Sequence, residues 1–143
     1  MIPTPDGESL SAFLIRPANK SLAKNITILM FHGNAGNIGY RLPIAKVLGD
    51  DIGCNVFMLQ YRGYGFSTGT PDEKGLTIDA QTGLDYIRQR AELKNTKIVI
   101  YGQSLGGAVG VGLAAKNQKD GDIAGIILEN TFLSIKKMIP AYV

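Results

Sequence analysis

Four short apolar runs, each followed by a polar or glycine-containing segment, dominate the hydrophobic pattern of the chain. They cover residues 26–31 (ITILMF), 56–61 (VFMLQY), 97–101 (KIVIY) and 123–128 (IAGIIL). Unbroken runs of this length, rich in isoleucine and valine, are typical of strands that are covered on both faces, as in a parallel sheet. Residues 9–17 (SLSAFLIRP) alternate more between apolar and polar positions, which predicts an edge strand at the start of the chain.

The segments between these runs show helical spacing. In two of them apolar residues recur every three or four positions, namely Tyr40, Ile44, Val47 and Leu48, then Ala80, Leu84, Ile87 and Ala91. The second of these helices is expected to have Thr70 as its N-cap, Pro71 in its first position and Glu73 closing a capping box. Residues 105–116 form the third expected helix.

Strands that alternate with helices in this way predict right-handed βαβ units and an α/β fold. The expected architecture is a mostly parallel sheet of about five strands with helices on both faces. A length of 143 residues suits one domain with a substantial core, so residues 1–143 are interpreted as a single domain.

Composition and charge argue against several other classes. The net charge is only +3 and the basic residues are scattered; the adjacent Lys136 and Lys137 fit a solvated helix face, so no nucleic-acid partner is expected. Cys54 is the only cysteine, which excludes an internal disulfide and a cysteine metal site. No pattern calls for a metal or a cofactor. Apolar runs stay well below ~18 residues and the opening residues do not resemble a signal peptide, so we expect an intracellular chain without a membrane span.

The candidate chemistry centres on Ser104, in the segment YGQSLGG. The apolar strand 97–101 leads directly into Gly102, and the helical pattern leaves from Leu105. A serine on such a strand-to-helix turn is the nucleophile elbow of the GxSxG motif, in which Gly102 and Gly106 must carry no bulk. The alternative interpretation is an ordinary tight turn in which Ser104 caps the helix.

The loop HGNAG favours the nucleophile interpretation. It follows the first parallel strand and therefore lies at the same sheet edge as Ser104. A backbone amide there, that of Asn34, can pair with the amide of Leu105 as an oxyanion hole. The alternative is a glycine-rich loop without chemistry. His32, the only histidine, is expected to brace this loop rather than to serve as the base for Ser104.

Five segments in order carry a resemblance to a known family: FHGNAGNIGYRLP, YRGYGFSTGTPDEKGL, DAQTGLDYI, YGQSLGGAV and ILENTFLSI. Together they resemble the α/β-hydrolase domain-containing 13-like serine hydrolases, also called the bud-emergence-46-like family. The resemblance implies an α/β-hydrolase fold, Ser104 as nucleophile, and Asn34 with Leu105 at the oxyanion hole. It places residues 61–65 beside the pocket, where Arg62 is expected to form a structural ion pair.

The chain departs from the family pattern after Ser104. Family members carry the triad acid and histidine beyond two further strands, whereas no histidine comes after Ser104 here. We therefore expect the chain to lack those strands, the family's first strand and its N-terminal membrane anchor; with that anchor the full-length protein would be membrane-associated. Glu129 is expected to be structural, and strand 123–128 is expected to be an exposed edge that self-associates.

Three functions are compatible with these patterns. The first is a serine hydrolase acting on an ester or thioester of a small acyl or lipid-like substrate, with the acid and histidine outside this chain. The second is a non-catalytic interaction protein that keeps the front half of the fold. The third is a flavodoxin-like module that binds phosphate through its glycine loop, although Gly33, Gly36 and Gly39 are spaced GxxGxxG rather than GxGxxG.

Overall fold

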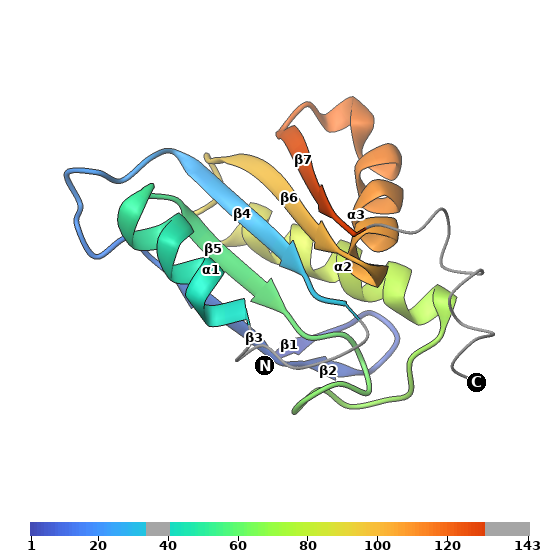
Figure 1. Ribbon diagram of the computed structural model, residues 1–143. Helices are drawn as coiled ribbons and strands as arrows, with labels where there is room; N and C mark the ends of the chain where they lie inside the picture. Colours follow the sequence, from blue (N-terminus) through green and yellow to red (C-terminus); the bar gives the residue numbers. More distant parts are fainter. Residues whose placement is uncertain (34–40, 131–143) are drawn as a thin grey trace.

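The computed structural model describes residues 1–33 and 41–130 and has a five-stranded sheet at its centre (Figure 1). The strands are β3 (Ala12–Ile15), β4 (Ile26–Phe31), β5 (Asn55–Leu59), β6 (Lys97–Gln103) and β7 (Ile123–Glu129), in the spatial order β3-β5-β4-β6-β7. Strand β3 is antiparallel to β5, and every other pair is parallel. The mostly parallel sheet is therefore confirmed, and each of the four apolar runs forms one of its strands. The run 123–128 is not covered on both faces, because β7 lies at the edge of the described sheet.

The expected edge strand at the start is confirmed in part. Residues 9–17 divide into β2 (Ser9–Leu10), which forms a separate two-stranded sheet with β1 (Ile2–Pro3), and β3, which joins the main sheet. Ser11 lies between them, and its backbone N–H donates to the Ser67 hydroxyl at 2.9 Å instead of to a strand. The chain passes from one sheet to the other at this residue, and its backbone donor is satisfied by a loop side chain.

Helices α2 (Glu73–Gln89) and α3 (Leu105–Lys116) bury their apolar sides against one face of the sheet. The expected N-cap of α2 was wrong. Asp72 caps the helix, and its carboxylate accepts from the Gly75 N–H at 2.5 Å. A carboxylate at this position caps as well as threonine does and also favours the positive end of the helix dipole. Because the helix ends at Gln89, Ala91 lies outside it.

The opposite face of the sheet is covered by α1 (Leu42–Lys46) and a π-helical turn, η2 (Val47–Asp51) (Figure 1). Ala45 packs there against Met30 and Met58. Val47, expected on the buried side, is 49% exposed. The expectation was wrong because the helix widens to i→i+5 bonding at this residue, which shifts the side chains around the axis. Tyr40, assigned to the same helix, lies outside the described residues.

Parallel pairing brings the carboxyl ends of the central strands to one edge. Phe31 at the end of β4 is aligned with Gly102 of β6, and Gln103 of β6 is aligned with Glu129 of β7. The loops that follow β4, β5 and β6 therefore all begin at this edge, where parallel α/β sheets bind their ligands.

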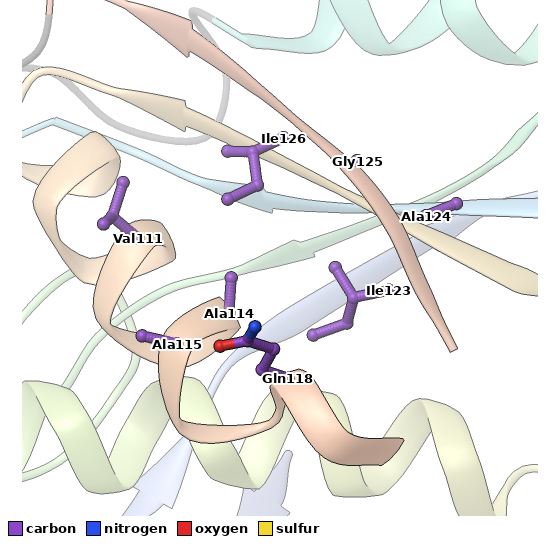
Figure 2. A pocket seen from close by; sticks show the side chains of 8 residues that line it. All are labelled: Val111, Ala114, Ala115, Gln118, Ile123, Ala124, Gly125 and Ile126. Atoms are coloured by element: carbon purple, nitrogen blue, oxygen red, sulfur yellow. The ribbon is translucent and has the colours of Figure 1, made fainter. Parts of the chain in front are cut away.

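Strand β7 forms the other edge of the described sheet and is apolar. Its side chains Ile126, Ile127 and Leu128 are 38%, 43% and 47% exposed. Figure 2 shows Ile123 and Ile126 on the side of β7 that faces α3, where a cavity of about 370 Å³ reaches Val111. From Ile123 to Leu128 this edge is apolar and carries no charge, which makes it a template for pairing with another chain.

We expect the 143-residue chain to self-associate through β7. Sizing chromatography with light scattering should show a mass above that of the monomer, and the substitution Ile127→Lys should lower it because a charge on an edge strand opposes strand pairing. A monomer that persists from high to low concentration in the unsubstituted chain would contradict this expectation.

Candidate active site

Ser104 occupies a strained turn between β6 and α3. Its backbone has φ 56° and ψ −119°, and Asn130 is the only other non-glycine residue with positive φ among the residues described. A conformation that L-residues rarely adopt costs free energy and is concentrated at functional turns. Ser104 occupies the N-cap position of α3, as the alternative interpretation expected, but its side chain makes no capping hydrogen bond to the helix.

The backbone of Ser104 is held on both sides. Its N–H donates to the Glu129 carbonyl of β7 at 2.8 Å, and its carbonyl accepts from the Gly107 N–H at 2.9 Å. These bonds fix the turn through its peptide groups and do not use the hydroxyl, which is the arrangement that a nucleophile needs.

The two flanking glycines have no room for a side chain. A Cβ added to Gly106 would overlap the carbonyl oxygen of Phe31, and one added to Gly102 would overlap the carbonyl oxygen of Gly106. All of these atoms belong to backbone, so no side-chain rearrangement could relieve the overlap. The close approach of β4, β6 and α3 at the turn therefore depends on glycine at both positions.

The structure describes one of the two expected oxyanion donors. Leu105 is buried and is the first residue of α3, where a backbone N–H has no acceptor within the helix. Asn34 lies outside the described residues. The last described residue before it, Gly33, is close to the serine: a Cβ built on Gly33 would lie 3.2 Å from Ser104 Cβ and 3.7 Å from Ser104 Oγ. The β4 loop thus begins beside the hydroxyl.

His32 is buried and braces the end of β4, as expected. Its Nδ1–H donates to the Gly33 carbonyl at 2.6 Å, and its Nε2 accepts from the Tyr61 N–H at 3.4 Å. The Tyr61 hydroxyl also donates to the His32 carbonyl at 2.9 Å, and the two rings lie 4.2 Å apart. Both ring nitrogens are occupied, so His32 offers no free acceptor for a serine proton.

Burial chiefly, with a smaller effect of the Arg41 charge, lowers the pKa of His32 from 6.5 to about 4 despite its bond to Gly33. Below pH 6.5 the unfolded chain therefore binds a proton that the folded chain does not. We expect stability to fall by about 2–3 kcal/mol as pH drops from 6.5 to 4. Hydrogen–deuterium exchange at the imidazole C2, read by mass spectrometry, measures this pKa directly. A value near 6.5 would contradict the burial argument, and His32→Gln should remove this part of the pH dependence.

Arg62 forms the structural ion pair that the sequence suggested. Its guanidinium bonds both carboxylate oxygens of Asp79 at 2.9–3.2 Å and reaches Asp6 at 2.8 and 3.0 Å. The hydrogen bond from Arg62, with one from Thr4, lowers the pKa of Asp6 to about 2. Sequence reasoning missed Asp79, which is fully buried on α2. Its burial could have been predicted from the sequence, because Asp79 directly precedes Ala80 on the apolar side of that helix.

Glu129 has the structural role that the sequence predicted, because its carboxylate is hydrogen-bonded to two side chains of β6. Its carboxylate accepts from the Tyr101 hydroxyl at 2.6 Å and from Gln103 Nε2 at 3.2 Å. Burial, together with the bond to Glu129, raises the pKa of Tyr101 to about 12. Tyr101 and Gln103 are two residues apart on β6, so their side chains lie on the same face of the sheet. This polar cluster therefore lies at the end of β6 that leads into Ser104.

Other kinds of site find little support in residues 1–33 and 41–130. No three histidine, cysteine or acidic side chains gather there in a way that could hold a metal ion. None of the helices in this part of the chain has the length and apolar character needed to cross a membrane. The cavity between α3 and β7 is lined by aliphatic side chains and Gln118, without an ionisable or nucleophilic group.

Comparison with known proteins agrees with this geometry. A family model described as the α/β hydrolase fold matches residues 26–142. The chain is 52% identical over 137 residues to protein bem46 of Schizosaccharomyces pombe, covering 96% of this chain and 45% of that protein. It is 45% identical over 133 residues to the α/β hydrolase domain-containing protein WAV2 of Arabidopsis thaliana, covering 93% and 42%. It thus spans about half the length of the curated relatives it matches.

Solved structures show the same fold. A serine hydrolase homologue from Coxiella burnetii superposes with a TM-score of 0.73 at 24% identity, covering 89% of this chain and 59% of that one. An esterase from Exiguobacterium antarcticum superposes with a TM-score of 0.71 at 20% identity, covering 98% and 52%. The resemblance noted from the sequence motifs is confirmed, and the flavodoxin-like alternative was wrong.

Proposed function

Because the chain belongs to the α/β-hydrolase family, and within it to the bem46-like proteins, we propose that it carries the nucleophile of a serine hydrolase. The observation that supports this most is the backbone of Ser104, held at φ 56° between β6 and α3 with its hydroxyl free of any capping role. Strain of this kind persists only where surrounding structure enforces it, as Gly102 and Gly106 do here.

In the proposed mechanism a general base removes the proton of Ser104, whose oxygen attacks the carbonyl carbon of the substrate. The negative charge that develops on the carbonyl oxygen is stabilised by the backbone N–H groups of Leu105 and Asn34. The alcohol or thiol leaves with a proton from the base, and water then releases the acyl group from Ser104.

The base and the acid that orients it come, in this proposal, from a part of the protein outside these 143 residues. His32 is the only histidine in the chain, and both of its ring nitrogens are occupied. The chain covers 45% of bem46, so a protein of the relatives' length has room for both residues. Glu129 is not assigned as the acid because its carboxylate already binds Tyr101 and Gln103.

The proposed substrates are carboxylic esters or thioesters with a small acyl or lipid-like group, and the mechanism needs no cofactor. The test is covalent labelling of Ser104 by a fluorophosphonate, which reacts only with an activated serine. The full-length protein should be labelled, whereas the 143-residue chain and a full-length Ser104→Ala variant should remain almost unlabelled. The exposed β7 edge favours a second candidate, a non-catalytic interaction protein; such a protein would remain unlabelled at full length.

A further inference from the structure

Within the described part of the chain, Arg41 is a cation without a partner at the sheet edge that carries Ser104. It directly precedes α1 and is half-buried, and its Nε is buried without a hydrogen-bond acceptor. Its guanidinium forms no ion pair with the residues described, whereas Arg62, Arg88 and Arg90 each bind a carboxylate. Burying a guanidinium donor without an acceptor costs free energy, so this one calls for an explanation in terms of function.

The charge of Arg41 acts at the ends of three adjacent strands. It adds to burial in lowering the pKa of His32, which follows β4. It also opposes the effect of burial, which raises the pKa of Tyr61, after β5, and of Tyr101, on β6. Arg41 is also the N-cap residue of α1, the helix that follows β4, so the topology places it at the sheet edge where the proposed substrate binds.

The carboxylates at this edge are already occupied. Asp79 is bound by Arg62, and Glu129 accepts from Tyr101 and Gln103. The side-chain oxygen of Gln103, next to Ser104 in sequence, is itself buried with no donor from the residues described. Among these residues, the guanidinium of Arg41 therefore has an unpaired donor at this edge, and no carboxylate without a hydrogen-bond partner is present to bind it.

We propose that Arg41 binds a negatively charged oxygen group, carboxylate or phosphate, on the substrate of Ser104. A guanidinium presents Nε–H and Nη–H as a planar fork that matches two oxygens of either group. The inference rests on the proposed function, and it narrows the substrate class from esters in general to esters that carry an anion beside the reacting carbonyl.

The kinetic test compares matched substrates on the full-length protein. One pair differs in the acyl part, 4-nitrophenyl butyrate against mono-4-nitrophenyl glutarate; the other differs in the alcohol part, acetylglycerol against acetylglycerol phosphate. We expect the wild-type protein to have a higher kcat/KM for the anionic member of one pair. A preference for the glutarate ester would identify a carboxylate as the group that Arg41 binds, and a preference for acetylglycerol phosphate would identify a phosphate. Arg41→Gln should reduce that preference about tenfold or more, and Arg41→Lys should restore part of it.

Lys46→Gln is the matched control, since Lys46 is an exposed cation in the last turn of α1 and its loss changes the net charge equally. It should leave the preference within about twofold, because solvent and salt screen an exposed charge. An equal loss in Lys46→Gln and Arg41→Gln would overturn the proposal, since it would indicate a general field rather than a binding group.

A binding measurement separates this inference from the proposed function. On full-length Ser104→Ala, monomethyl glutarate and glycerol phosphate should bind more tightly than dimethyl glutarate and glycerol in calorimetry, and Arg41→Gln should abolish the difference. If no ester is hydrolysed but this Arg41-dependent difference appears, the hydrolase proposal fails and the anion site stands. If neither anion binds better than its neutral match, the Arg41 proposal is overturned whatever the hydrolytic activity.

Discussion

A fluorophosphonate probe is expected to label the full-length protein at Ser104 and to leave the 143-residue chain almost unlabelled. A serine hydroxyl is weakly nucleophilic near neutral pH, and its reactivity depends on a positioned base. Loss of a triad residue in an assembled site leaves only ~10³–10⁴-fold catalysis over water. The 143-residue chain has one histidine and it is occupied by Gly33 and Tyr61, so we expect its labelling rate to fall at least a thousandfold, to about the value for Ser104→Ala.

Mass spectrometry should locate the label on the peptide that contains YGQSLGG, and Ser104→Ala at full length should remove it. Rapid labelling of the 143-residue chain that disappears in His32→Ala would contradict the assignment and make His32 the base. An unlabelled full-length protein that folds normally would instead favour the non-catalytic interaction protein.

The substitution Gly106→Ala is expected to destabilise the fold by about 4 kcal/mol, a large effect for one methyl group. The added Cβ would overlap the carbonyl oxygen of Phe31, so β4 and α3 must separate at the point where they support Ser104. Denaturant midpoints at constant m-value measure the change in the free energy of unfolding.

Gly112 provides the control on the same helix. A Cβ built there meets nothing within 4 Å, so Gly112→Ala should gain about 0.5–1 kcal/mol from helix propensity. If both substitutions changed the free energy of unfolding by similar amounts, the close approach at Gly106 would not contribute to stability. That result would contradict the interpretation of the turn as strained.

The sequence predicted the sheet well because its signals are local. Each central strand is one unbroken apolar run, and residues 105–116 form α3 with the bounds expected. The serine turn could be located because its glycines lie at the boundary between a strand pattern and a helix pattern. Helix ends are harder to predict where several neighbouring polar residues could serve as the N-cap. For α2 the sequence pointed to Thr70, whereas the structure has Asp72 at the N-cap.

Contacts between distant residues account for what the sequence left open. Arg62 binds Asp79, which is 17 residues away, and Asp6, which is 56 residues away; Tyr101 binds Glu129, which is 28 residues away. Only the packing of the fold brings these residues together. The unsatisfied Nε of Arg41 is recognisable only when the position of every nearby acceptor is known. Spacing rules describe single elements, so they contain no information on such pairs.

The hydrogen bond from the Ser104 N–H to the Glu129 carbonyl makes the serine the final rung of the β6–β7 ladder. The position of the Ser104 backbone therefore depends on β7, which is the outermost strand of the described sheet. We expect any part of the protein that packs on β7 to restrict the motion of Ser104 as well, because the two are joined by this hydrogen bond. The rigidity of β7 and the precision with which the Ser104 hydroxyl is placed therefore depend on each other.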